Sequence, residues 1–463
     1  MNFRWWLVGV SVLGIGLSGA TAQAQSILTP TSSSAQTEET LGGDGQRPVG
    51  DHRPILSGTL SLAEATRIAR EQNLGVQVAT QDVSIAEAQI KSAQSARLPV
   101  VSLGAAATLA NEDFFYTTGV GPGNIPRKAA GEFNAGLSLP LYTGGRLKAR
   151  VNQTQVEQEV ALADRATAQL EAILIVKQAY LQALFTRSQL DTYRKYVAER
   201  EVALQNTRDR FAVGKVARVY VLVDQTELAN AKRALIAAQT VFDKAMVDLK
   251  TGLGVSLASE FTLSDTLEAQ PIASDLSQIL AQARQNSPEL SALRLKVKAS
   301  EADIQIAKAA FLPQVNLYTQ AELRAPGSPG FGSGGSIAVV ANWPVFDFGG
   351  RKAEVDKSTA SIRKAQLQVQ QKEQELAKSL TQAWLDLQEA KSSMTLTQTN
   401  VAQAEEEQRL AQERFAVGRS IQVEVLRSSV ALLRARLDHF KTFYEYNLAI
   451  AQLERLTGIE IQS

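Results

Sequence analysis

Two long stretches of the chain carry apolar residues at helical spacing and contain neither proline nor glycine. They run from Arg146 to about Arg210 and from Arg351 to Phe415, about 65 residues each. At 1.5 Å per residue such a run makes a helix of roughly 100 Å, a length that predicts coiled-coil packing against other helices. In the first stretch the apolar residues that recur every three or four positions are Leu170, Ile173, Val176, Tyr180 and Leu184.

Each long stretch is accompanied by two shorter helical stretches of about 36 residues. Two of these placed end to end match one long helix, so we expect each long helix to lie beside two short helices stacked on a common axis. Gly214 and Gly418 follow the long stretches and supply helix-stopping turns, which predicts two helical hairpins with equivalent tips. The shorter stretches are 62–97, 215–250, 276–311 and 419–456.

Four further segments of about ten residues alternate between apolar and polar positions with a period of two. In the first segment Val101 and Leu103 face one way and Ser102 faces the other. This is the length and the pattern of a transmembrane β-strand. The connections 111–131 and 324–335 are rich in Gly and Pro and are predicted to be exposed loops. The predicted strands cover about 100–110, 132–141, 314–323 and 336–345.

A half-buried sheet of a soluble domain would show the same alternation as membrane strands. Two features favour the membrane: the alternation holds in all four segments, and we expect no fifth strand to complete a soluble sheet. Four strands leave two unpaired edges, which lipid does not tolerate, so closure must come from other copies of the chain. Three copies give twelve strands, an even number within the known range of barrels.

The predicted fold class is therefore mainly α with a small transmembrane β part. Each chain contributes long coiled-coil helical hairpins and four β-strands, and a trimer forms a 12-stranded barrel continued by an α-helical tunnel. A closed wall of helices that continues a barrel is a conduit. This architecture predicts passage of molecules through an outer membrane and part of the periplasm.

The order of elements occurs twice, which indicates a tandem duplication. Phe-Ala-Val-Gly stands at 211–214 and again at 415–418, each time after an Arg and 204 residues apart (415 minus 211). Pro140-Leu141-Tyr142 with Gly144-Gly145-Arg146 returns as Pro344-Val345-Phe346 with Gly349-Gly350-Arg351. We expect a first repeat over 58–262, with strands near 100–110 and 132–141, and a second repeat over 263–463.

The N-terminal residues are predicted to be removed or disordered. Residues 1–24 have the form of a signal peptide: Arg4, an apolar stretch from Trp5 to Leu17, and the cleavage site Ala22-Gln23-Ala24. About 13 apolar residues are too few for a membrane anchor, which needs roughly 20. Residues 25–57 are rich in Ser, Thr, Gln, Gly and Pro and are predicted to be a disordered linker. No other segment is apolar enough to be a transmembrane helix.

Composition narrows the function classes. The formal net charge is +1, which argues against a nucleic-acid partner, and the chain has no cysteine, so disulfides and thiolate sites are excluded. The two histidines are His52, in the predicted linker, and His439, alone in a helix. The glycines of 330–335 lie between strands and do not form a phosphate-binding loop. We expect no catalytic residues, no metal site and no cofactor, and hence no enzyme.

These elements and their spacing resemble the TolC family of outer-membrane efflux and secretion channels over roughly residues 58–460. The resemblance lies in the two Pro-to-Arg junctions and the two Arg-Phe-Ala-Val-Gly tips, in this order and twice over. It implies a homotrimeric duct in the outer-membrane lipid, with its helical part in the periplasm. It also implies a periplasmic adaptor (membrane fusion) protein and an inner-membrane pump or ABC transporter as partners. The fold does not distinguish small-molecule from unfolded-protein cargo.

The resemblance also implies where the channel narrows. The family places acidic residues just past the second tip in a Val-Asp-Val-Leu-Asp pattern, and here the stretch is Val423-Glu424-Val425-Leu426-Arg427. Three copies of Glu424 would form a carboxylate ring that favours cations, and Arg427 would compensate part of that charge. Alternatively, Glu424 lies on a solvated helix face near Arg427 and Arg419. In the first repeat the matching positions are Tyr220 and Val223, so that hairpin is not expected to carry the constriction.

The hairpin tips are candidate docking points for adaptor hairpins, a role that rests on the resemblance. The alternative is that these residues only form the turns. The candidates are Arg210, Phe211, Gly214 and Lys215 at the first tip and Arg414, Phe415, Gly418 and Arg419 at the second.

Two other function classes remain. A periplasmic coiled-coil adaptor or structural protein also uses long helical hairpins, but would lack the four strands and would not need the duplication. An envelope enzyme on a helical scaffold would need a cluster of His, Asp or Ser, which the sequence does not offer.

Overall fold

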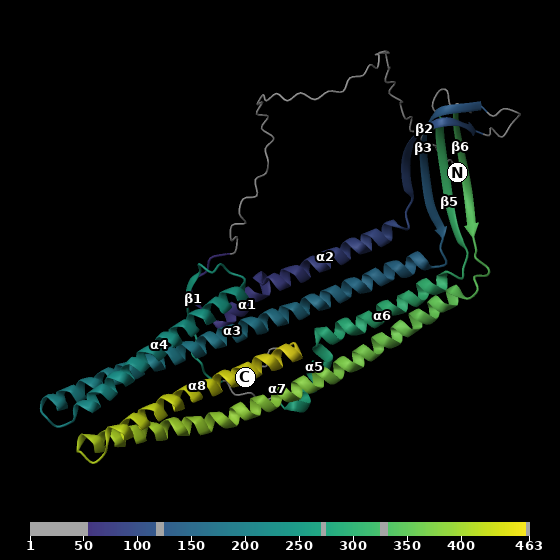
Figure 1. The fold of residues 1–463 in the computed structure, drawn as a ribbon. Coiled ribbons are helices and arrows are strands. Elements are labelled where there is room, and N and C mark those ends of the chain that lie inside the picture. Colours follow the sequence, from purple (N-terminus) through teal and green to yellow (C-terminus); the bar gives the residue numbers. More distant parts are fainter. Residues whose placement is uncertain (1–53, 117–124, 270–274, 325–331, 460–463) are drawn as a thin grey trace, which may run out of the picture. The chain divides into compact units, whose positions relative to one another are not determined.

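A computed structural model describes residues 54–116, 125–269, 275–324 and 332–459. The predicted signal peptide and nearly all of the predicted linker lie outside these ranges. Within them, helices predominate, and the strands gather in one four-stranded sheet and one two-stranded sheet (Figure 1).

Two helices of 67 residues dominate the structure, α3 (Arg146–Ala212) and α7 (Gly350–Ala416). The helix α3 packs against α1 (Leu62–Gln72), α2 (Leu74–Ser95) and α4 (Arg218–Leu253). The helix α7 packs in the same way against α5 (Leu276–Asn286), α6 (Pro288–Ala309) and α8 (Gln422–Thr457). The expected arrangement of one long helix beside stacked shorter ones is confirmed (Figure 1). No helix in the described ranges combines the length and apolarity needed to cross a bilayer.

The predicted helices at 62–97 and 276–311 are each broken in two, which the sequence pattern did not predict. Asn73 ends α1 and caps α2: its side chain accepts from the Gly75 N–H at 2.8 Å and donates to the Gly252 carbonyl at 3.0 Å. Ser287 ends α5 and caps α6: its hydroxyl accepts from the Leu290 N–H, and Pro288 is the first residue of the new helix. The breaks let the chain turn over the end of the neighbouring helix.

The four predicted strands form one antiparallel sheet in the order β2-β3-β5-β6. Two of them are longer than predicted, β2 (Val100–Tyr116) and β3 (Ile125–Tyr142), so most of the predicted loop 111–131 is strand. The strands β5 (Gln314–Arg324) and β6 (Gly332–Asn342) likewise leave a shorter connection than 324–335. β6 ends at Asn342, three residues before its predicted end, where Pro344 cannot donate to a ladder.

The strand register places the apolar positions of all four strands on one face. Val101, Leu137, Thr319 and Ile337 stand opposite one another across the sheet, and Leu139, Leu317 and Val339 form a second such row. In this four-stranded sheet no residue whose side chain is described is buried, and Leu103 and Ile337 are 83% and 79% exposed. The described part of a single chain therefore leaves both faces of this sheet uncovered.

A second, two-stranded sheet contradicts the expectation that no fifth strand exists. The strand β1 (Ser57–Leu60) pairs in parallel with β4 (Glu260–Leu263), so the predicted linker ends in ordered structure. Leu60 and Tyr180 of α3 are fully buried beside this pair in the first core, and the Tyr180 hydroxyl contacts both the Leu60 carbonyl and Asp265. The second half has a core of its own on α5, α7 and α8, centred on Ile279, Leu380 and Leu453.

The strand-to-helix junctions correct the sequence match between the halves by one residue. Gly145 and Gly349 are the equivalent N-caps, so Gly144 (φ +61°) corresponds to Phe348 (φ +54°) and not to Gly349. Arg146 and Arg351 are therefore not equivalent positions in the two halves. The Arg351 guanidinium pairs with Asp347 at 2.9 Å and lies over the Phe311 ring, so Arg351 stabilises the junction.

Candidate functional site

The two hairpin tips have the same backbone geometry. Gly214 and Gly418 both adopt φ +74°, a left-handed conformation that favours glycine. Past each glycine an N–H bonds back to the helix it has left: Lys215 to the Arg210 carbonyl and Arg419 to the Arg414 carbonyl, both at 2.8 Å. The turn-forming role of the tip residues is thereby explained.

The structure brings the two tips into contact with each other. The Arg210 guanidinium lies 4.8 Å from the centre of the Phe415 ring and donates to the Phe415 carbonyl at 3.5 Å. The Gln422 side-chain amide, at the start of α8, donates to the Tyr220 carbonyl in the first turn of α4 at 3.3 Å. At the turns themselves the exposed apolar side chains are Phe211, Val213 and Val417.

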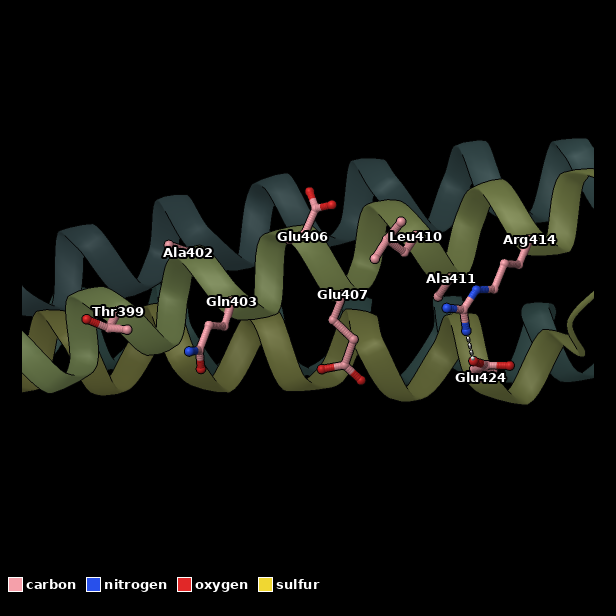
Figure 2. Close-up of a pocket in the computed structure, with 9 residues that line it drawn as sticks. All are labelled: Thr399, Ala402, Gln403, Glu406, Glu407, Leu410, Ala411, Arg414 and Glu424. Carbon is pink, nitrogen blue, oxygen red and sulfur yellow. Dashed lines mark ion pairs between the residues drawn. The ribbon is translucent and has the colours of Figure 1, made fainter.

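Glu424 stands in the first turn of α8, on an exposed face. Its carboxylate accepts from the Ser420 hydroxyl at 2.5 Å and lies 3.7 Å from the Arg414 guanidinium at the end of α7 (Figure 2). Both side chains are about half exposed, and an exposed pair of this kind contributes about 0–1 kcal/mol. The pairing with Arg414 therefore holds the carboxylate in place only weakly.

Glu424 closes one end of an open groove of about 510 Å³ between α7 and α8. Besides Glu424 the groove is lined by two acids, Glu406 and Glu407, and by the base Arg414. An ion pair with Arg409 lowers the pKa of the Glu406 carboxyl below its usual range, so this acid is ionised at neutral pH. Arg427 is exposed one turn further along α8, and among the described residues no ion pair joins it to Glu424.

The sequence pattern did not predict a buried polar cluster that lies behind the tips. Arg200 of α3 donates to the Ser429 hydroxyl of α8 at 2.7 Å, and Gln408 of α7 donates to the same hydroxyl at 3.2 Å. Asp224 of α4 is also buried. One signal could have revealed it: Asp224 starts a row of residues spaced by seven that continues with Ala231, Ala238 and Ala245, all buried.

His439 packs between α7 and α8, as a lone helical histidine usually does. Its ring lies edge-on to Phe443 with centroids 4.8 Å apart, and Nδ1 is 3.1 Å from the Thr397 hydroxyl. Burial lowers the pKa of the imidazole below its ordinary value.

We expect acidification to destabilise the protein through His439. Because its pKa is lower in the folded than in the unfolded state, the unfolded state binds the extra proton first. Stability is thus retained above the unfolded-state pKa of about 6.5 and falls as the pH drops from there towards the folded-state pKa. Thermal unfolding of the wild type and of His439→Gln between pH 8 and 5 measures this. The difference between the two curves should depend on pH, and parallel curves would contradict it.

Antiparallel amphipathic strands with open edges, long helical hairpins and paired tips define the class of outer-membrane channel proteins with a helical tunnel. The comparison with known families agrees. Residues 66–255 and 279–459 match the family described as "Outer membrane efflux protein", and the chain belongs to this family. The resemblance to the TolC family and the outer-membrane location are thereby confirmed. The family is one of channel and transport proteins, not of enzymes.

Individual relatives share a minority of residues with this chain. Outer membrane protein TolC of Escherichia coli (strain K12) is 24% identical over 229 residues, which cover 49% of this chain and 46% of that protein. Cobalt-zinc-cadmium resistance protein CzcC of Cupriavidus metallidurans is 23% identical over 406 residues, covering 87% and 91%. The chain spans about half the length of several of the curated relatives it matches, TolC among them.

Solved structures confirm the fold class. The outer membrane protein VceC from Vibrio cholerae superposes with a TM-score of 0.71 at 18% identity, over 87% of this chain and 97% of that chain. The open state of the Neisseria gonorrhoeae MtrE outer membrane channel gives 0.71 at 17% identity, over 87% and 89%. At these identities the similarity is one of fold.

Proposed function

We propose that this chain forms, as a homotrimer, the outer-membrane exit duct of a tripartite efflux pump or a type I secretion system. The observation that carries the proposal is the four-stranded sheet, whose apolar rows are exposed and whose strands β2 and β6 each have one neighbour in the described part of the chain. Such edges are stable in lipid only when other strands pair with them. Three copies supply twelve strands, and the helical hairpins continue the passage into the periplasm.

The proposed partners are a periplasmic adaptor protein and an inner-membrane pump or ABC transporter. The paired tips suit an adaptor, because they combine exposed apolar side chains with exposed Arg414, Arg419 and Lys215. The names of relatives include both an efflux pump protein and an alkaline protease secretion protein, so the proposal concerns a duct for small molecules or unfolded proteins. We assign the two repeats 58–262 and 263–463 to successive parts of the wall.

Glu424 is the proposed acidic residue of the constriction. The exposed carboxylate at the tip of the second hairpin, beside the acids of the α7–α8 groove, supports this role. Arg414, 3.7 Å away, compensates part of the charge, a function that the sequence had led us to assign to Arg427. We retain Arg427, one turn along α8, as a second candidate for the constriction.

Glu424→Ala is expected to lower the cation preference of the channel in planar-bilayer recordings. Removal of three carboxylates from one ring changes the electrostatic energy of a monovalent ion at that ring by on the order of RT. The cation-to-anion permeability ratio should therefore fall by about two- to fivefold. Glu424→Gln separates charge from shape and should behave alike. Glu445→Gln, an exposed acid far along α8 that pairs with Lys441, serves as the control. If neither Glu424 variant changes the permeability ratio, Glu424 does not line the constriction. If the wild-type protein does not conduct ions at all, the duct itself is contradicted.

A further inference from the structure

Behind the hairpin tips lies a second cavity, of about 750 Å³, whose lining does not include Glu424. It is bounded by α3 and α4 of the first half and by α7 and α8 of the second. Its apolar wall includes Val202, Phe415 and Leu426. The volume is in the range of pockets that hold small organic molecules.

Three buried polar side chains that line this cavity each have one atom without a hydrogen-bond partner in the described part of the chain. They are Arg200 (Nε), Asp224 (Oδ2) and Gln422 (Oε1), which are 4%, 7% and 7% exposed. An unsatisfied buried polar group costs about 1–3 kcal/mol, and native structures hold few of them. Three such groups around one cavity therefore indicate a built site.

The identities of the free atoms are set by their neighbours. The Gln422 amide donates through Nε2 to the Tyr220 carbonyl, and a flipped amide would place two oxygens against each other, so the free atom is the acceptor Oε1. Tyr220 lies one turn before Asp224 on α4, which brings this oxygen to the same end of the cavity as the carboxylate. The Arg200 guanidinium is held by Ser429 and by the Tyr196 ring, which leaves its Nε–H as a donor.

The charges and acceptors favour an organic cation over a metal ion. The lining holds three carboxylates, of Glu199, Asp209 and Asp224, and two guanidinium groups, of Arg200 and Arg210. One free carboxylate oxygen and one amide oxygen are too few for Ca²⁺, which takes six to eight oxygens. No group of three or more potential metal-binding side chains is found among the described residues. A planar cation with several N–H donors can serve both free oxygens at once.

We infer that this cavity binds a small organic cation. An amidinium or guanidinium group lies against Asp224 and Gln422, an acceptor of the ligand receives the Arg200 Nε–H, and an apolar body contacts Val202, Phe415 and Leu426. Binding joins α3, α4 and α8 and is independent of whether the protein transports anything.

Titration calorimetry on the full-length protein in mild detergent tests the site with 4-acetamidobenzamidine at neutral pH. This probe carries an amidinium group, an aromatic ring and an amide carbonyl. We expect saturable binding to the wild type with a Kd below about 1 mM. The Kd for Asp224→Asn should be about ten- to hundredfold higher, which corresponds to the loss of a hydrogen bond to a charged group. Asp243→Asn, an exposed acid elsewhere on α4, is the matched control and should bind as the wild type does.

A second probe keeps the test independent of any variant. The neutral isostere 4-acetamidobenzamide has the shape of the first probe but no positive charge, so it should bind the wild type at least tenfold more weakly. Asn keeps the shape of Asp224 and removes a buried unpaired charge, so the unfolding midpoint of Asp224→Asn should not fall below that of the wild type. Each of three outcomes would overturn the proposal. Equal binding of the two probes would show that the positive charge is not recognised, and unchanged affinity in Asp224→Asn would show that the probe binds elsewhere. No saturable binding would show that the cavity holds solvent only.

Discussion

Gly144→Ala is expected to lower the stability of the folded chain by about 3–5 kcal/mol, a large effect for one methyl group. A Cβ at this position would stand 2.8 Å from both the Ala309 carbonyl oxygen and Leu312 Cβ, where the first-half junction contacts the end of α6. The positive φ of +61° adds strain, but Phe348 tolerates φ +54° at the equivalent place in the second half. The close approach therefore accounts for most of the effect. The measurement is the unfolding midpoint in detergent, together with the yield of folded protein.

Gly145→Ala is the matched control for this prediction. Gly145 also has a positive φ, of +88°, but a Cβ there meets nothing within 4 Å. Only the conformational strain remains, so we expect a loss of about 1–2 kcal/mol. If the two variants lose equal stability, the contact between the Gly144 junction and α6 does not have the role that the structure assigns to it.

Lys177→Met is expected to destabilise the contact between the halves by about 2–4 kcal/mol. Lys177 of α3 pairs with Glu454 of α8 at 2.5 Å, and the two side chains are only 15% and 14% exposed. Methionine removes one charge of a largely buried pair, and breaking such a pair costs more than the pair itself contributes. The free energy of unfolding of the variant, measured with denaturant, gives the loss.

The double variant Lys177→Met with Glu454→Gln should lose less than the sum of the two single variants, because each single variant already removes the interaction between the two charges. The control is Lys232→Met, which breaks the Lys232–Glu201 pair between α3 and α4. Both of its side chains are about half exposed, so the change should stay within about 0.5 kcal/mol. Strict additivity in the double variant would mean that Lys177 and Glu454 are not energetically coupled.

The regular elements could be predicted because their signals are local and long. The absence of Pro and Gly over about 65 residues placed both long helices, whose observed starts, Arg146 and Gly350, lie within one residue of prediction. The two-residue alternation placed the four strands. In contrast, β1 and β4 have four residues each and pair across about 200 residues, so no local pattern distinguishes them from linker. The helix break at Asn73 depends on a hydrogen bond to Gly252, which only the fold brings near.

The candidate site was predictable in part. The repeated tips follow from the two glycines, whereas Glu424 was singled out by the resemblance to the TolC family. Its partner Arg414 and the Arg210–Phe415 contact cross between helices, and repeated letters do not show such contacts. The repeated Gly-Gly-Arg even misled, because in the second half it stands one residue later relative to the start of the helix. The sequence shows Asp224 as a lone acid in a row of alanines. Only the fold shows that it lines one cavity together with Arg200 and Gln422.

The proposed function requires that copies of this chain close the sheet and surround a passage. The mass of the protein extracted from the outer-membrane fraction in mild detergent, corrected for bound detergent, tests it most directly. We expect a trimer, since three four-stranded sheets joined edge to edge in a closed barrel leave no unpaired edge. A monomer recovered from the soluble periplasm would contradict it and would favour a coiled-coil scaffold without a pore.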